Sequence, residues 1–147
     1  MHIEKNICES VLGTLLNIER KSKDAYKARQ YLEDMNIRNE LHLKRDGDKY
    51  QMPHACYTLS NVGFCEFLKS VKFPDGYASN ISRCINIADG KVSRLKSHDC
   101  HILLQRLLPI GIRGYLLKDV YVALVELGTF FKDLCCKTLG VEEINRL

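Results

Sequence analysis

The chain has 147 residues, of which 46% are hydrophobic and 27% are charged, so it carries enough apolar surface for one folded domain and is not a disordered tail. No apolar run approaches the ~20 residues needed to cross a bilayer, and the start of the chain lacks the apolar stretch of a signal peptide. The net charge of +4 comes from 22 basic and 18 acidic residues that are mixed along the chain, without the footprint of a dedicated DNA-binding arm.

The seven cysteines are an odd number and fit no compact disulfide framework. Most of them stand among apolar neighbours, which predicts reduced thiols that serve as small hydrophobic side chains in an intracellular protein. The vicinal pair Cys135-Cys136 falls on a predicted helix, where adjacent side chains diverge and a disulfide between them is strained.

The first segment, residues 1–36, is predicted to be a helical hairpin. Residues 3–18 have the spacing of an amphipathic helix, and Ser22 is placed to cap a second helix over residues 23–36, with Arg29 on its outward face. The apolar stripe of the first helix consists of Ile3, Ile7, Val11, Leu12, Leu15 and Leu16.

The next segments mix turns with one helix. Residues 37–57 are predicted to be a loop or a short hairpin around Gly47, because Asp-Gly-Asp favours a turn. Residues 58–96 are predicted to hold a helix that begins near Ser60 and ends near Val71, followed by loops. A short helix built on Ile81, Cys84, Ile85 and Ile87 is an alternative to loops in the later part.

The last segment, residues 97–140, is predicted to be a helical pair. Ser97 opens its first helix, Pro109 stops or kinks it, and glycines form a flexible corner before a second helix over residues 117–137. The second helix carries a heptad-like stripe of Val120, Leu124, Leu127, Phe131 and Leu134. An uncovered stripe of this kind also predicts self-association or poor solubility.

The sequence therefore predicts a mainly α fold of about five helices with irregular loops and one short hairpin. Two groups of side chains stand out as candidate metal or catalytic sites. His98, Cys100 and His101 are potential metal ligands, although no C-x-x-C pair accompanies them and polar helix-end or core packing is the alternative. His2 and Glu4 could bind a divalent metal or position a base, but only Glu4 and Glu9 supply carboxylates on this helix.

Three blocks of the chain, taken in order, resemble the later part of plant En/Spm-like (CACTA) transposases. The blocks lie at residues 1–16, 55–60 and 95–114, and the last reads LKSHDCHILLQRLLPIGIRG. The resemblance implies an incomplete segment of an RNase H-like DDE transposase, just before its C-terminal domain of unknown function. In the parent family three carboxylates hold two divalent ions, Mg²⁺ or Mn²⁺.

The resemblance also implies site residues. His2 matches the histidine of a D-x-M-H segment whose aspartate lies upstream, and Glu4 is the candidate for a third carboxylate. Because upstream catalytic aspartates are missing from this sequence, the first hypothesis is a transposase fragment without catalytic activity or a cofactor of its own. It implies a nuclear protein whose partners are DNA or other transposase subunits, with no membrane and no identified small-molecule substrate.

Two further hypotheses are open. The second is a domesticated helical module that binds DNA or a partner protein through basic groups near residues 20–29 and 106–118, whose DNA-contacting residues the sequence does not specify. The third is a small metal-dependent enzyme that uses His98, Cys100 and His101.

Overall fold

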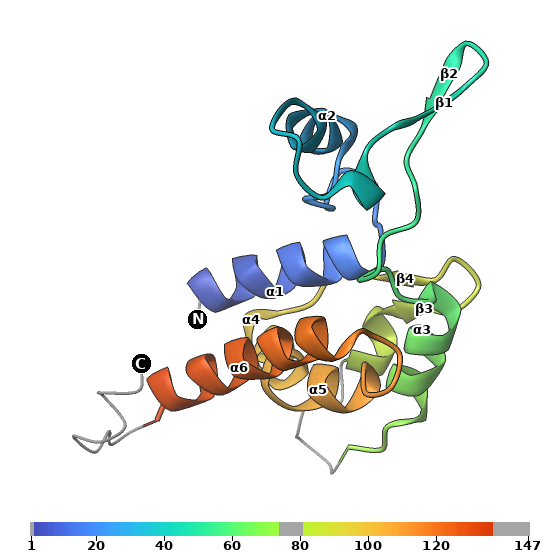
Figure 1. Cartoon of the computed structure of the whole chain (residues 1–147). Coiled ribbons are helices and arrows are strands. Elements are labelled where there is room, and N and C mark those ends of the chain that lie inside the picture. Colours follow the sequence, from blue (N-terminus) through green and yellow to red (C-terminus); the bar gives the residue numbers. More distant parts are fainter. Residues whose placement is uncertain (1, 74–80, 137–147) are drawn as a thin grey trace.

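The computed structural model describes residues 2–73 and 81–136, and it confirms a mainly helical fold. A helical body holds most of the chain, and an arm built from α2 and a β-hairpin extends from it (Figure 1). The helices of the body are α1 (His2–Leu15), α3 (Asn61–Ser70), α4 (Ser97–Ile102), α5 (Leu108–Gly111) and α6 (Lys118–Leu134).

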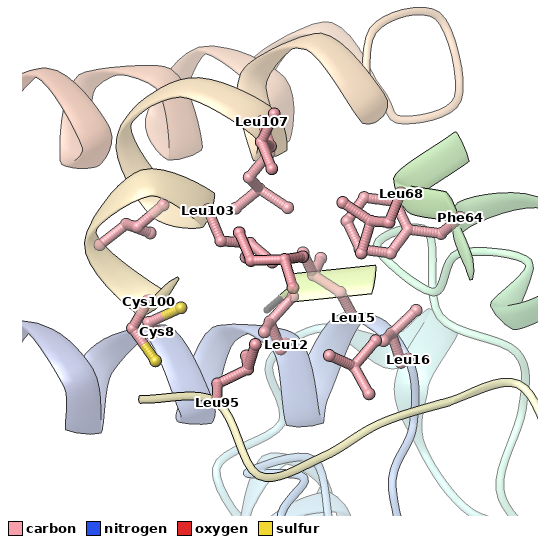
Figure 2. Close-up of a cluster of buried hydrophobic side chains, with 14 of the residues drawn as sticks. Cys8, Leu12, Leu15, Leu16, Phe64, Leu68, Leu95, Cys100, Leu103 and Leu107 are labelled. Atoms are coloured by element: carbon pink, nitrogen blue, oxygen red, sulfur yellow. The ribbon is translucent and has the colours of Figure 1, made fainter. Parts of the chain in front are cut away.

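The core of the body lies where α1 packs against α4, with α3 and the end of α6 closing it. Leucines dominate this core, and Figure 2 shows those of α1 meeting those that follow α4. The predicted helix over residues 3–18 ends at Leu15, because the chain turns back and the carbonyl of Lys21 comes to 2.6 Å from where a Cβ on Gly13 would lie. The completely or almost completely buried core side chains include Cys8, Leu16, Cys65, Leu68, Ile81, Cys100, Leu103, Leu104, Leu108 and Ile112.

The helix that begins at Ser97 is interrupted by a π-helical segment, η3 (Leu103–Leu107), immediately before Pro109. The N–H of Leu108 donates to the carbonyl of Leu103, five residues back, and Pro109 has no N–H to continue an ordinary helix. Pro109 was predicted to stop or kink this helix. It does not stop it, because Pro109 lies in the first turn of α5 and the helical backbone continues through the π-helical segment to Gly111. Gly111, predicted to be part of a flexible corner, is instead tightly packed. A Cβ at this position would lie 2.5 Å from the ring of Phe67.

Helix α6 packs against the rest of the body through its C-terminal half. A Cβ on Gly128 would lie 2.8 Å from the carbonyl oxygen of Leu104, so only glycine permits this close approach of α6 to η3. Phe131 is buried, whereas Leu134, at the end of the predicted stripe, is 50% exposed. The stripe therefore contributes to the core of the body, and part of it remains at the surface.

The arm consists of α2 (Tyr26–Asp34), the 3₁₀ turn η1 (Asn39–Leu41) and the antiparallel strands β1 (Lys44–Asp46) and β2 (Lys49–Gln51). The predicted hairpin at Gly47 is confirmed, and this glycine has a φ of +60°, which the two-residue turn requires. Both strands are fully exposed. The arm therefore projects from the body on a few contacts near its base (Figure 1).

Two predictions for the arm are wrong. Ser22 does not cap α2: its hydroxyl accepts the N–H of Asp24, and the helix begins three residues later than predicted. Arg29 does not face outward but is 1% exposed, because the carboxylate of Asp24 and backbone carbonyls surround its guanidinium.

A second small hairpin was not specifically predicted. Strands β3 (Ile85–Asn86) and β4 (Lys91–Val92) pair antiparallel after the 3₁₀ turn η2 (Ile81–Cys84). The helix predicted to begin near Ser60 is α3, and the hydroxyl of Ser60 accepts the N–H of Gly63 as its N-terminal cap. The first of the loops predicted after this helix falls largely on residues 74–80, which lie outside the described residues.

Candidate functional site

A buried carboxylate joins α1 to the helix that follows Ser97. Glu4 on α1 is 1% exposed. Nδ1 of His101 lies 3.1 Å from each carboxylate oxygen, and Nε2 of Gln105 donates to Oε1 at 2.8 Å. These three side chains, which we call the Glu4 cluster, connect residues about a hundred positions apart in the chain.

The proton of the His101 ring is assigned to Nδ1, which gives the Glu4 carboxylate a donor, and the Gln105 amide is oriented with its N–H toward Glu4. Nε2 of Gln105 also lies 2.9 Å from Nδ1 of His101, so with this tautomer two donors lie close together beside the carboxylate. Both donors face a carboxylate that has left water, which offsets the cost of its burial. Within the described residues no buried side-chain nitrogen or oxygen lacks a partner.

A thiol lies beside the Glu4 cluster. Cys135 follows α6, and Glu4, His101 and Cys135 each offer a ligand atom within 4.8 Å of the other two. Among the described residues this is the one group of three or more metal-ligating side chains at such distances. Cys135 is exposed and His101 keeps 30% of its side-chain surface, so the group is open to solvent on one side.

The other candidate residues from the sequence lie elsewhere. His2 and His98 are exposed, and neither joins the Glu4 cluster. Cys100 faces Cys8, and their sulfur atoms lie side by side between α4 and α1 (Figure 2). The hydrogen bond with Cys100 and burial raise the pKa of Cys8, and the same hydrogen bond lowers the pKa of Cys100. The structure therefore brings together Glu4 and His101, from two different predicted groups, and separates Cys100 from them.

A second buried polar cluster lies at the base of the arm. The guanidinium of Arg29 donates to both carboxylate oxygens of Asp24, with Nη2 at 2.6 Å from Oδ2, and Nη1 donates to the carbonyl of Leu41 at 2.8 Å. Nη2 also reaches the carbonyl of Pro53 at 3.3 Å, and the hydroxyl of Tyr57 donates to Asp24 at 2.8 Å. This Arg29 cluster joins α2, η1 and the chain after the hairpin.

The pKa values in the Arg29 cluster reflect these contacts. Burial acts to raise the pKa of Asp24, but hydrogen bonds from Arg29 and Tyr57 outweigh it and the pKa is lowered. Burial and the hydrogen bond to Asp24 raise the pKa of Tyr57 to about 12. The cluster is therefore at its strongest with Asp24 ionised and Tyr57 neutral.

Two of the hollows that the described residues form lie beside α1 and differ in their lining. One, of about 400 Å³, is lined by Arg20, Lys21 and Lys23 together with Glu9 and two neutral polar residues of α1, Asn6 and Ser10. The other, of about 320 Å³, is mainly apolar and lies between α1, Tyr57 and the start of α6. Its apolar lining comes from Val11, Leu15, Tyr57, Val120 and Leu124.

Sequence reasoning missed Gln105, Cys135 and the whole Arg29 cluster as partners. One signal was present: Glu4, Cys8 and Leu12 are spaced four residues apart, and all three are buried on one face of α1.

Comparisons with protein-family models, curated proteins and solved structures found no match to this chain. No helix in the described ranges has the length and hydrophobicity to cross a membrane.

Proposed function

We propose that this chain is a helical segment derived from a transposase of the plant En/Spm-like (CACTA) family and that it does not cut DNA on its own. In this proposal it is an incomplete part of an RNase H-like enzyme, and it acts in the nucleus with DNA or with other transposase subunits as partners. The resemblance of the three sequence blocks supplies the family. The burial of Glu4 supports the absence of independent catalysis.

The environment of Glu4 argues for a structural role. Two-metal cleavage of DNA needs several carboxylates that converge on a pair of ions beside the DNA substrate. Glu4 has 1% of its surface exposed, which leaves no face for DNA, and its hydrogen bonds with His101 and Gln105 join α1 to the helix that follows Ser97. The ligand group around it contains one carboxylate, together with an imidazole and a thiol, so this group supplies one of the three carboxylates that the chemistry requires.

A DNA-cleavage assay tests this proposal. The full chain is incubated with a duplex that carries terminal inverted repeats, in Mg²⁺ or in Mn²⁺, and we expect no cleavage above that of buffer. Cleavage that depends on the metal ion, is lost in Glu4→Gln and is kept in Glu9→Gln would overturn the proposal. Glu9 is a suitable control because it lies on the same helix, partly exposed, outside the Glu4 cluster.

One observation favours a second function, a module that binds DNA through its phosphates. Arg20, Lys21 and Lys23 converge on the hollow of about 400 Å³ beside α1, and one carboxylate, that of Glu9, shares it. All three basic residues are exposed. A concave surface with an excess of positive charge suits a phosphate group, and such contacts are independent of base sequence.

The salt dependence of DNA binding tests this second function. We expect the affinity for a duplex to fall as salt rises, with a log–log slope that shrinks by about 0.9 for each phosphate contact removed. A triple change of Arg20, Lys21 and Lys23 to glutamine reduces the slope, whereas Lys49→Gln, an exposed change on β2 away from the hollow, leaves it unaltered. The absence of binding at low salt, or equal effects of both variants, contradicts a phosphate site in this hollow.

A further inference from the structure

We propose that Glu4, His101 and Cys135 form a binding site for a single zinc ion, with one coordination position open to solvent. The three side chains come from α1, α4 and the end of α6, and one ligand atom of each lies within 4.8 Å of the others. The site goes beyond the transposase proposal, because it requires neither DNA nor the metal ions of a DDE enzyme.

The distances suit tetrahedral zinc. Bonds of about 2.0–2.1 Å to nitrogen and oxygen, at tetrahedral angles, separate the two ligand atoms by about 3.3 Å. Nδ1 of His101 lies 3.1 Å from each oxygen of Glu4. A thiolate at about 2.3 Å from the ion lies about 3.6 Å from the other ligands. The ligand atoms lie up to 4.8 Å apart in the structure, so binding requires the exposed Cys135 side chain to approach the other two ligands.

The surroundings hold the ligands in place. Gln105 donates to Oε1 of Glu4 and so leaves Oε2 for the ion, in the way that outer hydrogen bonds orient metal ligands. Buried Phe131 and the close contact of Gly128 with Leu104 fix the last turns of α6 against the segment that carries Gln105. Cys135 is therefore held near the Glu4 cluster by packing that does not involve the cysteine itself.

The ligand types select the ion. A thiolate and an imidazole favour zinc over Mg²⁺ or Ca²⁺, which take oxygen ligands. Three protein ligands and one water complete a tetrahedral zinc site. Binding displaces the thiol proton of Cys135, and the ring proton of His101 moves from Nδ1 to Nε2, so that Nδ1 can face the ion.

Cobalt, a spectroscopic substitute for zinc, tests the site in the full, tag-free chain under reducing conditions. We expect one equivalent of Co²⁺ to bind with a thiolate-to-cobalt absorption band, and one equivalent of Zn²⁺ to displace it. We expect Cys135→Ser to abolish the band. Removal of a residue that only hydrogen-bonds to a metal ligand lowers metal affinity roughly 10- to 100-fold, and we expect His101→Ala, which removes a ligand, to lower it by more. Cys135 is exposed, so its replacement leaves the fold intact, which circular dichroism checks.

The neighbouring thiol is the matched control. Cys136 is exposed like Cys135, but its thiol donates to the carbonyl of Lys132 at 3.3 Å and it does not belong to the ligand group. Cys136→Ser is expected to keep the band and the affinity of the unmodified chain. No cobalt band, a band that survives in Cys135→Ser, or equal loss in both serine variants, as for adventitious chelation by the vicinal pair, would overturn the proposal.

Discussion

The body and the arm bury charge in different settings. In the body, Glu4 and Asp99 are the buried charged residues, and the core beside them is formed by leucine, isoleucine, phenylalanine, valine and cysteine side chains. In the arm, Arg29 and Leu41 are the buried residues between positions 24 and 54. The body is therefore stabilised mainly by apolar packing, with a polar cluster added to it, whereas the arm depends on one guanidinium and the groups that surround it.

The largest expected effect comes from removing that guanidinium. Arg29→Met leaves the carboxylate of Asp24 and the carbonyls of Leu41 and Pro53 without their donor, and breaking a buried pair in this way costs about 3–5 kcal/mol. Hydrogen exchange should show that the amides of α2 lose protection while those of α1 and α4 keep it.

The matched control for Arg29 is Arg38, which forms an exposed ion pair with Glu40 in the same arm. Arg38→Met is expected to leave the protection of α2 unchanged, because water replaces an exposed pair. Equal loss of protection in the arm and the body of Arg29→Met would show that the two parts unfold together, and would break the comparison.

A smaller effect is expected in the body, from Gly128→Ala. Alanine favours a helix interior by about 1 kcal/mol, but its Cβ would lie 2.8 Å from the backbone oxygen of Leu104. Because the backbone at Leu104 moves only at a high energetic cost, the steric cost of the added Cβ exceeds the gain in helix propensity. We expect the free energy of unfolding, measured by urea denaturation, to fall by about 1–2 kcal/mol. Gly63→Ala in α3, where the nearest atom is 3.7 Å away, is expected to stabilise; a gain in both variants would contradict the tight contact of α6.

The smallest expected effect is a pH dependence confined to the arm. The pKa of Tyr57 rises from 10.0 to about 12 on folding. The contribution of Tyr57 to the stability of the arm is therefore complete below pH 10 and is lost between about pH 10 and pH 12. The lowered pKa of Asp24 acts at the other end: its contribution is present above its unfolded value of 3.8 and is lost as the pH falls through the folded value.

Tyr57→Phe separates these two contributions. The variant is expected to lose the alkaline decline in arm protection between pH 10 and pH 12 and to keep the acid decline, as measured by hydrogen exchange and by protease cleavage in the arm. An alkaline decline of the same size in Tyr57→Phe would assign it to another group.

Much of the body follows from periodicity, and the polar clusters do not. The apolar spacing of α1, α3 and α6 predicted these helices to within a few residues, because one buried face suffices to mark a helix. Arg29 was predicted to face outward since a charge in an amphipathic pattern normally does. Its burial depends on carbonyls at Leu41 and Pro53, which depend on how the chain returns after the hairpin.

The Glu4 cluster could be predicted from the sequence only in part. Glu4 shares the buried face of α1 with Cys8 and Leu12, but the predicted stripe began at Ile3, which is 72% exposed, and did not include Glu4. His101 was noted for metal binding. Their pairing could not be predicted, because it depends on how α1 crosses α4. Gln105 carried no sequence signal of its own, and it reaches Glu4 through the π-helical segment before Pro109.

The most direct test of a structural rather than a catalytic Glu4 is the free energy of unfolding of Glu4→Gln, measured in a chelator. The amide keeps the shape but puts a donor against the donors of His101 and Gln105, so we expect a loss of about 1–3 kcal/mol. Glu9→Gln on the same helix is expected to change stability by less than about 0.5 kcal/mol. A Glu4→Gln variant as stable as the unmodified chain would contradict the structural role.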